Sequence, residues 1–236
     1  MKIIFYGLII LFFSQSAYSH DYIIRGRTDL PYIALTFDDG PRPETTRKIL
    51  SILKKHRVPA TFFVIGKQVK KYPDLLTEEV SGGHEIGNHT YSHSILTNLT
   101  AEKIKQEILL TEQIVLKISG KRTKYFRPPA GHFNYLVSNC ANRLGYKTIL
   151  CTNNAGDYFN AATKWRPSEK YIKSKILGNI RGGAIILMHD GTQMTVDMLE
   201  NIITNLQKRG YKFVTVSELI EYKSLAGKLP DKPLKL

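Results

Sequence analysis

The chain has 236 residues, of which 42% are hydrophobic and 23% are charged. This composition predicts one globular domain with a substantial buried core, and it excludes a disordered or fibrous protein. The 34 lysines and arginines outnumber the 20 aspartates and glutamates, so the chain should attract polyanions.

The first nineteen residues are typical of an export signal. Lys2 precedes an apolar run over 3–13, and Ala17-Tyr18-Ser19 fits the small-x-small pattern of cleavage sites. The run is shorter than the roughly 20 apolar residues that span a bilayer. We therefore predict a signal peptide over 1–19 and a secreted, periplasmic or cell-envelope protein with no transmembrane segment after cleavage. An uncleaved membrane anchor is the alternative.

Removal of this signal peptide would leave 33 basic and 20 acidic residues, a net charge of 33 − 20 = +13. For an exported protein, this charge predicts an anionic envelope surface as a partner. Nucleic acid is not expected, because the sequence carries no nucleic-acid-binding motif. Alternatively, the lysines simply solvate the outer faces of helices.

From residue 32 onward, short strand-like runs alternate with amphipathic helical stretches. Apolar and β-branched runs predict strands at 32–37, 59–65, 84–88, 124–127, 146–151, 184–188 and 213–216. Helical periodicity, capping residues and glycine stops predict helices near 49–56, 67–80, 100–118, 133–144, 168–179, 194–208 and 217–223. This alternation favours parallel strands joined by crossovers. We therefore predict an α/β barrel of about seven parallel strands over 20–225, followed by a basic C-terminal tail at 226–236.

Four polar clusters follow predicted strands, at the edge where parallel barrels place their active sites. The first is TFDDGP, in which Asp38 and Asp39 come directly after an apolar strand. Adjacent carboxylates repel each other, so a metal ion or an arginine should hold them in place. The same residues also form a good turn sequence, which is the alternative interpretation.

The second cluster is HTYSH, with His89 and His93 four residues apart. Imidazoles at this spacing lie on one side of a helical turn and can reach the same ion. Two histidines and one carboxylate leave an open position for water, as in catalytic zinc sites. We therefore predict a metal site, with a purely structural histidine pair as the alternative.

The third and fourth clusters are RPPAG and LMHD. Arg127, at a strand end, can hold a carboxylate in its ionised form. His189, at the end of a buried strand, is a candidate general acid. A surface arginine beside a proline turn and a packed core histidine are the respective alternatives.

In this order, TFDDG, HTYSH, RPPAG and LMHD resemble the motifs of the polysaccharide deacetylases, carbohydrate esterase family 4, also called the NodB-homology domain. The resemblance extends from about Tyr32 to Tyr222. It implies a distorted (β/α) barrel of about seven strands. It also implies a metal-dependent hydrolase that removes N-acetyl groups from an amino-sugar polymer or oligosaccharide, such as peptidoglycan, chitin or an exopolysaccharide.

The resemblance assigns roles to the first three clusters. Asp38 corresponds to the general base, and Arg127 corresponds to the arginine that orients this base. Asp39, His89 and His93 correspond to the ligands of one divalent metal ion. Zinc is the expected ion, with cobalt or nickel as alternatives.

The resemblance also implies the remaining site residues. His189 corresponds to the catalytic acid, which an aspartate tunes; Asp157 is the best match for that aspartate. The backbone N–H of Ala130 would belong to the oxyanion hole, and Leu187 would line the pocket for the acetyl methyl group.

Two departures from the family motifs affect the walls of the substrate groove. Ala130 stands where the family carries an aromatic residue, and Tyr158 stands where it carries a tryptophan. Substrate identity is therefore less defined than reaction type. Tyr158 and Trp165, the only tryptophan, could stack on sugar rings or simply pack their loop.

Three alternative functions are an O-acetyl esterase acting on a xylan-type polymer, a catalytically silent carbohydrate-binding relative, and a basic envelope-binding protein. The pairing of the two cysteines is also open. Cys140 and Cys151 could form a disulfide in an oxidising compartment, but their spacing does not establish the required geometry.

Overall fold

The computed structural model describes residues 22–158 and 166–221 of the chain. The predicted signal peptide, the basic C-terminal tail and Trp165 lie outside these described residues. Among the helices within 22–158 and 166–221, none combines the length and the apolar character needed to cross a lipid bilayer.

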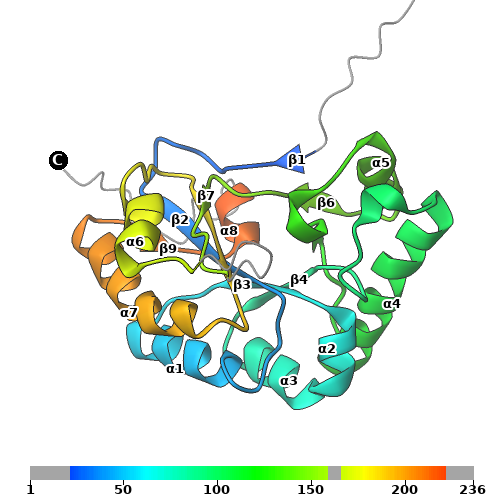
Figure 1. Cartoon of the computed structure of the whole chain (residues 1–236), viewed down its shortest axis with the longest axis horizontal. Helices are drawn as coiled ribbons and strands as arrows, with labels where there is room; N and C mark the ends of the chain where they lie inside the picture. Colours follow the sequence, from blue (N-terminus) through cyan, green and yellow to red (C-terminus); the bar gives the residue numbers. More distant parts are fainter. Residues whose placement is uncertain (1–21, 159–165, 222–236) are drawn as a thin grey trace, which may run out of the picture.

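The strands of the described residues form one parallel sheet that curves into part of a barrel (Figure 1). They are Tyr22–Ile23 (β1), Tyr32–Asp38 (β2), Thr61–Val64 (β3), Glu85–Asn88 (β4), Tyr125–Phe126 (β5), Lys147–Ile149 (β6), Asn153–Asn154 (β7), Ile185–His189 (β8) and Lys212–Phe213 (β9). Their order is β1-β6-β5-β4-β3-β2-β8-β7, and β9 pairs with the start of β2. The predicted α/β fold, a distorted barrel of parallel strands, is confirmed.

Two short strands, β1 and β7, were not predicted, and they lie at the two ends of the strand order. The fifth predicted strand, over 146–151, ends early as β6, because the chain there leaves one side of the sheet and joins the other side at β7. The N–H of Leu150 donates to the Ile23 carbonyl at 2.8 Å, whereas the N–H of Thr152 donates to the Ile185 carbonyl at 3.0 Å. Residues 150–152, the crossing segment, thus bridge the two ends of the sheet.

Helices connect most of these strands. They are Thr46–His56 (α1), Gly66–Lys71 (α2), Pro73–Ser81 (α3), Ala101–Ser119 (α4), Tyr135–Arg143 (α5), Glu169–Leu177 (α6), Gln193–Lys208 (α7) and Val216–Ile220 (α8), with 3-10 turns at Leu96–Asn98 and Pro129–Gly131. The single helix predicted over 67–80 is wrong, because the structure has α2 and α3 there. Pro73 has no N–H to donate and disfavours helical angles at Tyr72 (φ −131°, ψ 61°), so the helix is interrupted.

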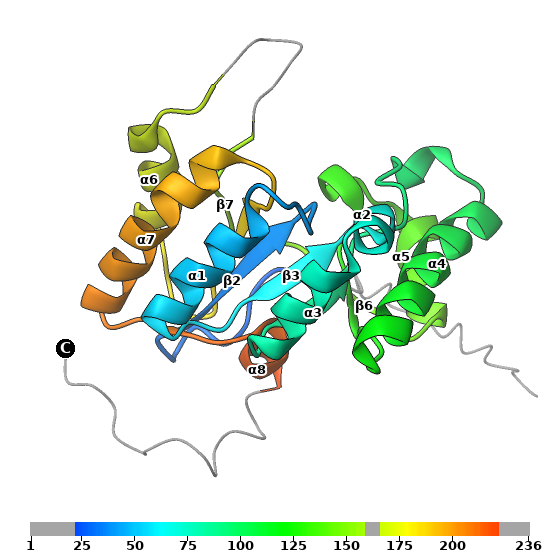
Figure 2. The ribbon, with the colours of Figure 1, turned by 90° about the horizontal axis from the view of Figure 1, so that it is seen from below.

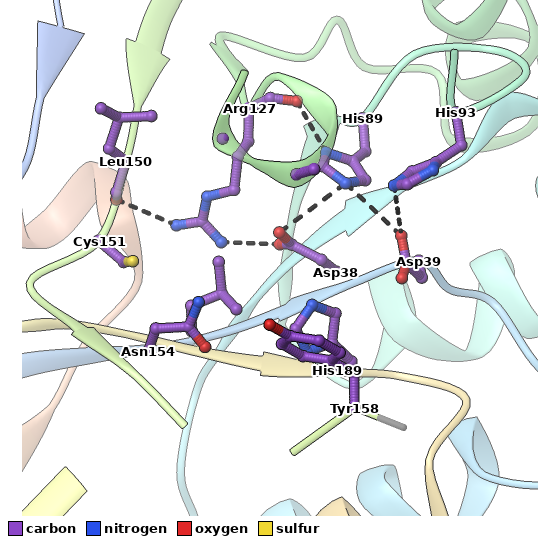
Figure 3. Close-up of a pocket in the computed structure, with 13 residues that line it drawn as sticks. Asp38, Asp39, His89, His93, Arg127, Leu150, Cys151, Asn154, Tyr158 and His189 are labelled. Carbon is purple, nitrogen blue, oxygen red and sulfur yellow. Dashed lines mark hydrogen bonds and ion pairs between the residues drawn. The ribbon is translucent and has the colours of Figure 1, made fainter. Parts of the chain in front are cut away.

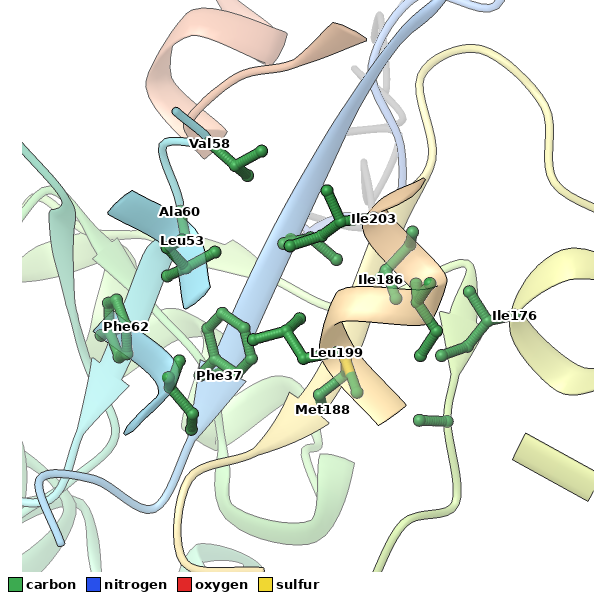
Figure 4. Close-up of a cluster of buried hydrophobic side chains, with 14 of the residues drawn as sticks. Phe37, Leu53, Val58, Ala60, Phe62, Ile176, Ile186, Met188, Leu199 and Ile203 are labelled. Atoms are coloured by element: carbon green, nitrogen blue, oxygen red, sulfur yellow. The ribbon is translucent and has the colours of Figure 1, made fainter. Parts of the chain in front are cut away.

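Helices α1 to α7 cover the outer face of the sheet (Figures 1 and 2), whereas Val216 and Leu219 of α8 pack in a separate cluster with residues of the inner face such as Ala34. Neighbouring helices contact each other in the order α6, α7, α1, α3, α4 and α5. The main core lies between this layer and the central strands. Figure 4 shows Phe37, Phe62 and Ile186 of the sheet beside Leu199 and Ile203 of α7, and all five side chains are fully buried.

Alternation along the strands separates core side chains from polar ones. Phe37 packs outward against the helices, whereas Thr36 and Asp38 point into the barrel. In β8, Met188 packs outward and His189 faces inward, and Asp38 is directly paired with His189 in the parallel register. Polar side chains at the carboxyl ends of different strands therefore meet inside the mouth of the barrel.

Both cysteines are free thiols. Cys140 is buried in α5, within an apolar cluster between α4 and α5. Cys151 lies in the crossing segment and lines a pocket at the mouth of the barrel. The disulfide alternative is not adopted, because the two thiols lie in different layers of the fold.

Candidate active site

A buried ion pair lies inside the mouth of the barrel. Asp38 is 3% exposed, Arg127 is 1% exposed, and Nη1 of Arg127 donates to Oδ1 of Asp38 at 2.7 Å. The guanidinium also donates to the Thr36 hydroxyl at 2.8 Å and to the carbonyls of Ile149 and Leu150 at 3.2 Å each. These four hydrogen bonds fix a positive charge beside the Asp38 carboxylate.

Close packing beneath the guanidinium sets its orientation. The guanidinium carbon of Arg127 lies 4.1 Å from the centroid of the Phe63 ring. That ring in turn covers Gly87 of β4, where an added Cβ would come within 2.5 Å of the ring. Glycine is therefore required at position 87, and β3 and β4 together support the arginine that follows β5.

The HTYSH sequence forms an irregular turn, so the predicted helical placement of its histidines is wrong. Thr90 and His93 adopt left-handed backbone angles (φ 67° and 61°), which a helix does not allow. The Glu107 carboxylate of α4 holds the turn by accepting hydrogen bonds from two of its backbone N–H groups, at 3.0 and 2.7 Å. The rings of His89 and His93 still come together, with centroids 5.1 Å apart.

Asp39, His89 and His93 converge at the mouth of the barrel (Figure 3). One possible ligand atom of each residue lies within 4.8 Å of the other two. Asp39 Oδ1 lies 3.5 Å from His89 Nε2 and 3.2 Å from His93 Nε2. His89 Nδ1 lies 2.7 Å from the Arg127 carbonyl oxygen, so it donates there and leaves the lone pair of Nε2 facing the cluster.

This cluster fits a divalent metal ion. Asp39 Oδ1 is buried, and no described residue forms an aligned hydrogen bond with it, which is costly unless a cation takes that place. Two imidazole nitrogens and one carboxylate oxygen form the donor set of a catalytic zinc-type site. The left-handed backbone of Asp39 (φ 75°) adds strain of the kind that concentrates at functional sites.

The histidines and Asp39 perturb one another electrostatically. Burial raises the pKa of Asp39, but the contact with His93 and the charges of both histidines outweigh burial and bring this pKa to about 2. The contact with Asp39 raises the pKa of His93, whereas burial lowers the pKa of His89. An ionised Asp39 and a neutral His89 are the forms that bind a metal.

A second imidazole–carboxylate pair lies across the pocket. His189 Nδ1 is 2.7 Å from Asp157 Oδ1, and the backbone N–H of His189 donates to Asp157 Oδ2 at 2.8 Å. The Thr195 hydroxyl also donates to Oδ2. Burial lowers the pKa of His189, but the hydrogen bond and charge of Asp157 outweigh burial and raise this pKa to about 9. Asp157 therefore orients the ring and favours its protonated form.

A pocket of about 520 Å³ joins these groups. The pocket is lined by Asp38, Asp39, His89, His93, Arg127 and His189, and by three of the predicted substrate contacts: Ala130, Leu187 and Tyr158. Tyr158 is 45% exposed, and its ring centroid lies 5.6 Å from that of His189. The fourth predicted contact, Trp165, lies outside the described residues.

Other parts of this site were not predicted from the sequence. Leu150, Cys151 and Asn154 form one wall of the pocket, and no motif marks them because their position follows from the crossing segment. Glu107 and Thr195 act from remote helices, by holding the histidine turn and Asp157 respectively. Their sequence neighbourhoods carry no signal for either contact.

Comparison with known proteins places this site in a family. The family model described as polysaccharide deacetylase matches residues 25–149. A peptidoglycan-N-acetylglucosamine deacetylase of Bacillus cereus is 39% identical over 196 residues, covering 81% of this chain and 89% of the relative. The peptidoglycan-N-acetylmuramic acid deacetylase PdaA of Bacillus subtilis is 37% identical over 211 residues, covering 87% of this chain and 78% of the relative.

Solved structures agree with these sequence relatives. The structure of PdaA, described as a family 4 carbohydrate esterase, has a TM-score of 0.78 at 36% identity, with 86% of each chain covered. BA3943 of Bacillus anthracis, a pseudoenzyme of the same family, has a TM-score of 0.76 at 31% identity, covering 84% of this chain and 68% of that one. This chain belongs to the polysaccharide deacetylase family, carbohydrate esterase family 4. The predicted enzyme class, a polysaccharide N-deacetylase, is confirmed.

Proposed function

We propose that this protein is a metal-dependent deacetylase that removes N-acetyl groups from the amino sugars of peptidoglycan. One observation supports the proposal: three groups of side chains face one pocket. They are the metal-type cluster of Asp39, His89 and His93, the Asp38 carboxylate paired with Arg127, and the His189 imidazole bonded to Asp157. The relatives support the choice of polymer, because they are named for N-acetylglucosamine and N-acetylmuramic acid in peptidoglycan.

Asp39, His89 and His93 would hold the metal ion, with zinc expected and cobalt or nickel as alternatives. Bound there, the ion would polarise the acetyl carbonyl and lower the pKa of a bound water towards about 7. The Arg127 carbonyl would fix the tautomer of His89 for this role.

Asp38 would act as the general base. Arg127 occupies Oδ1 of this carboxylate, whereas Oδ2 lies 3.8 Å from His89 Nε2 and faces the metal-type cluster. Oδ2 can therefore accept a proton from a water that attacks the acetyl carbon. Arg127, which does not face the attacking water in this scheme, would be a positioning residue.

His189 would act as the general acid. Its Nδ1–H is engaged by Asp157, so the proton on Nε2 is the one it can deliver. As the new bond from the water oxygen to the acetyl carbon forms and the carbon–nitrogen bond breaks, that proton goes to the sugar nitrogen. The products are the free amine and acetic acid, which releases its own proton to solvent as acetate, and the other proton of the water rests on Asp38.

The pocket walls would place the substrate. The backbone N–H of Ala130 would stabilise the oxyanion, and Leu187 would contact the acetyl methyl group. Tyr158 would contact the sugar ring, and Trp165 is proposed to do the same. Export by the signal peptide at 1–19 would bring the enzyme to peptidoglycan, and its positive charge would favour an anionic envelope surface.

The test is acetate release from a panel of glycans, with mass spectrometry to locate each lost acetyl group. The panel comprises peptidoglycan strands, chitooligosaccharides and O-acetylated xylan, and the full chain is assayed with added zinc. Wild type should deacetylate peptidoglycan, and Asp38→Asn should lose roughly 10²–10⁴-fold in rate while still binding zinc.

The matched control is Asp74→Asn, which removes an exposed carboxylate from α3 and should leave the rate unchanged. Full activity in Asp38→Asn would remove Asp38 from the mechanism. Release of acetate from xylan alone would replace the proposed N-deacetylase with an O-acetyl esterase.

A further inference from the structure

A second, smaller cleft opens beside the catalytic pocket. It measures about 280 Å³ and shares Asp39, Tyr158 and His189 with the larger pocket. Arg42, which no part of the proposed chemistry uses, also lines this cleft. A substrate group lying next to His189 can therefore reach this arginine without leaving the site.

The structure holds Arg42 in place. Its backbone N–H donates to the Thr46 hydroxyl at 2.6 Å, and its Nε–H donates to the Asp39 carbonyl at 3.1 Å. Its stem lies against Gly191, where an added Cβ would come within 3.2 Å of Arg42 Cγ and where φ is 122°. Glycine at 191 thus makes room for the side chain. Arg42 is a positioned group rather than a freely moving surface arginine.

The charged end of Arg42 is available to a ligand. Its two terminal nitrogens make no hydrogen bond or ion pair with other residues in 22–158 or 166–221. Asp190, a buried carboxylate that feels the charge of Arg42, is not hydrogen-bonded to it. The Asp190 oxygens accept hydrogen bonds from Thr45 and Thr46 at 2.5 Å each. Glu44 is an exposed acid on the rim of the same cleft. A fixed guanidinium with free terminal nitrogens suits a carboxylate, which it can bind through two parallel hydrogen bonds.

We propose that Arg42 is a specificity-determining residue that binds a carboxylate on the sugar being deacetylated, namely the lactyl carboxylate of N-acetylmuramic acid. The inference rests on the proposed function. In that sugar the lactyl ether is on C3, next to the C2 that carries the acetamide. His189 would protonate the C2 nitrogen and also lines the cleft of Arg42, so a carboxylate on the short C3 arm falls within this cleft. N-Acetylglucosamine has only a hydroxyl at C3 and offers Arg42 no charge.

The experiment compares kcat/KM on two glycans: peptide-free strands whose muramic acid carries a free lactyl carboxylate, and a neutral chitooligosaccharide. In Arg42→Ala, the ratio of kcat/KM on the charged glycan to that on the neutral one should fall roughly 10- to 100-fold. Arg42→Lys keeps the charge but cannot form two parallel hydrogen bonds, so its ratio should lie between those of Arg42→Ala and wild type. Lys48→Ala, which removes an exposed charge on α1 outside the cleft, is the matched control and should leave the ratio unchanged.

A second arm uses wild-type protein and so does not depend on the folding of a variant. Methyl esterification of the lactyl group should lower wild-type kcat/KM by a similar factor, and Arg42→Ala should not respond to the ester. Equal losses on both glycans in Arg42→Ala, or wild-type indifference to the ester, would overturn the inference.

A calorimetric measurement of the affinity for the charged glycan separates this inference from the proposed function. Binding weakened by Arg42→Ala supports the inference even if no acetate is released, an outcome that would refute only the deacetylase.

Discussion

The barrel interior and the helix layer each bury a carboxylate, and they treat it in opposite ways. Asp38 is 3% exposed and is paired with the Arg127 guanidinium. Glu79 of α3 is fully buried, and neither of its oxygens has a hydrogen-bond partner among the described residues. Burial, followed by the charges of Asp190 and Glu78, raises the pKa of Glu79 well above its usual value.

The difference shows where this fold needs a buried charge. Moving an ion out of water costs several kcal/mol unless a partner compensates. At the barrel mouth, four hydrogen bonds fix a cation beside Asp38, so a charged base can exist there. Glu79 has no such partner among the described residues, so burial favours its protonated form instead.

Replacing Arg127 with methionine should break this comparison most strongly. The variant leaves Asp38 buried without its cation, so we expect a loss of about 3–5 kcal/mol in the free energy of unfolding, together with loss of deacetylation. Urea unfolding and acetate release measure the two effects. Arg47→Met is the control, because it removes an exposed ion pair with Glu78 and should cost about 1 kcal/mol or less. Equal costs in the two variants would contradict the proposed role of the buried pair.

Asp157→Asn should lower the rate less than Arg127→Met but should also change its pH dependence. The buried Asp157 carboxylate is bonded to the imidazole of His189. Asp157 raises the pKa of His189 to about 9, so removing its charge should lower that pKa. The rate should fall on the order of 10²-fold. The alkaline limb of the kcat–pH profile should also move to lower pH, because the acid loses its proton earlier. An unmoved alkaline limb would exclude His189 as the general acid.

Glu79→Gln should give the smallest effect, and it should be stabilising. The folded-state pKa of Glu79 lies above the unfolded value, so the folded state binds a proton that the unfolded chain releases above about pH 4.5. Wild-type stability from this group is complete at low pH and declines as pH rises. Glutamine does not titrate, so the variant should gain on the order of 1 kcal/mol at pH 8, and the gain should shrink towards pH 5.

Denaturant unfolding of both proteins across this pH range measures the difference. Asp190, whose pKa burial raises to about 6, titrates in both proteins and therefore cancels to first order. Glu102→Gln, which changes an exposed carboxylate on α4 that does not perturb Glu79, is the control and should lack the pH trend. A variant that is less stable than wild type at pH 8 would show that the Glu79 carboxyl has a stabilising partner.

Local sequence patterns were enough to predict much of the fold and of the candidate site. Apolar runs located seven of the described strands, and the polar residues after them marked Asp38, Arg127 and His189 correctly as neighbours. The pairing of His89 with His93 was also predicted, but from helical geometry that the structure does not have. A left-handed turn held by Glu107 brings these rings together, and that carboxylate comes from another helix.

Features that depend on distant backbone contacts could not be predicted in this way. The crossing segment exists because Leu150 and Thr152 bond to opposite ends of the sheet, and no periodicity encodes such a bridge. The cleft of Arg42 depends equally on the pairing of β8 with β2, which brings His189 beside Asp38. By contrast, the break at Pro73 was visible in the sequence, because proline at that position interrupts any helix.

The crossing segment forms a pocket wall whose sequence can vary separately from that of the strands. Leu150 and Cys151 of this segment line the pocket, yet its backbone is joined to the flanking strands mainly at its two ends. Substitutions there can reshape what the groove accepts without shifting the strands that carry the ion pair and the imidazoles. New glycan preferences can therefore arise from substitutions in the crossing segment while the hydrolytic chemistry stays unchanged.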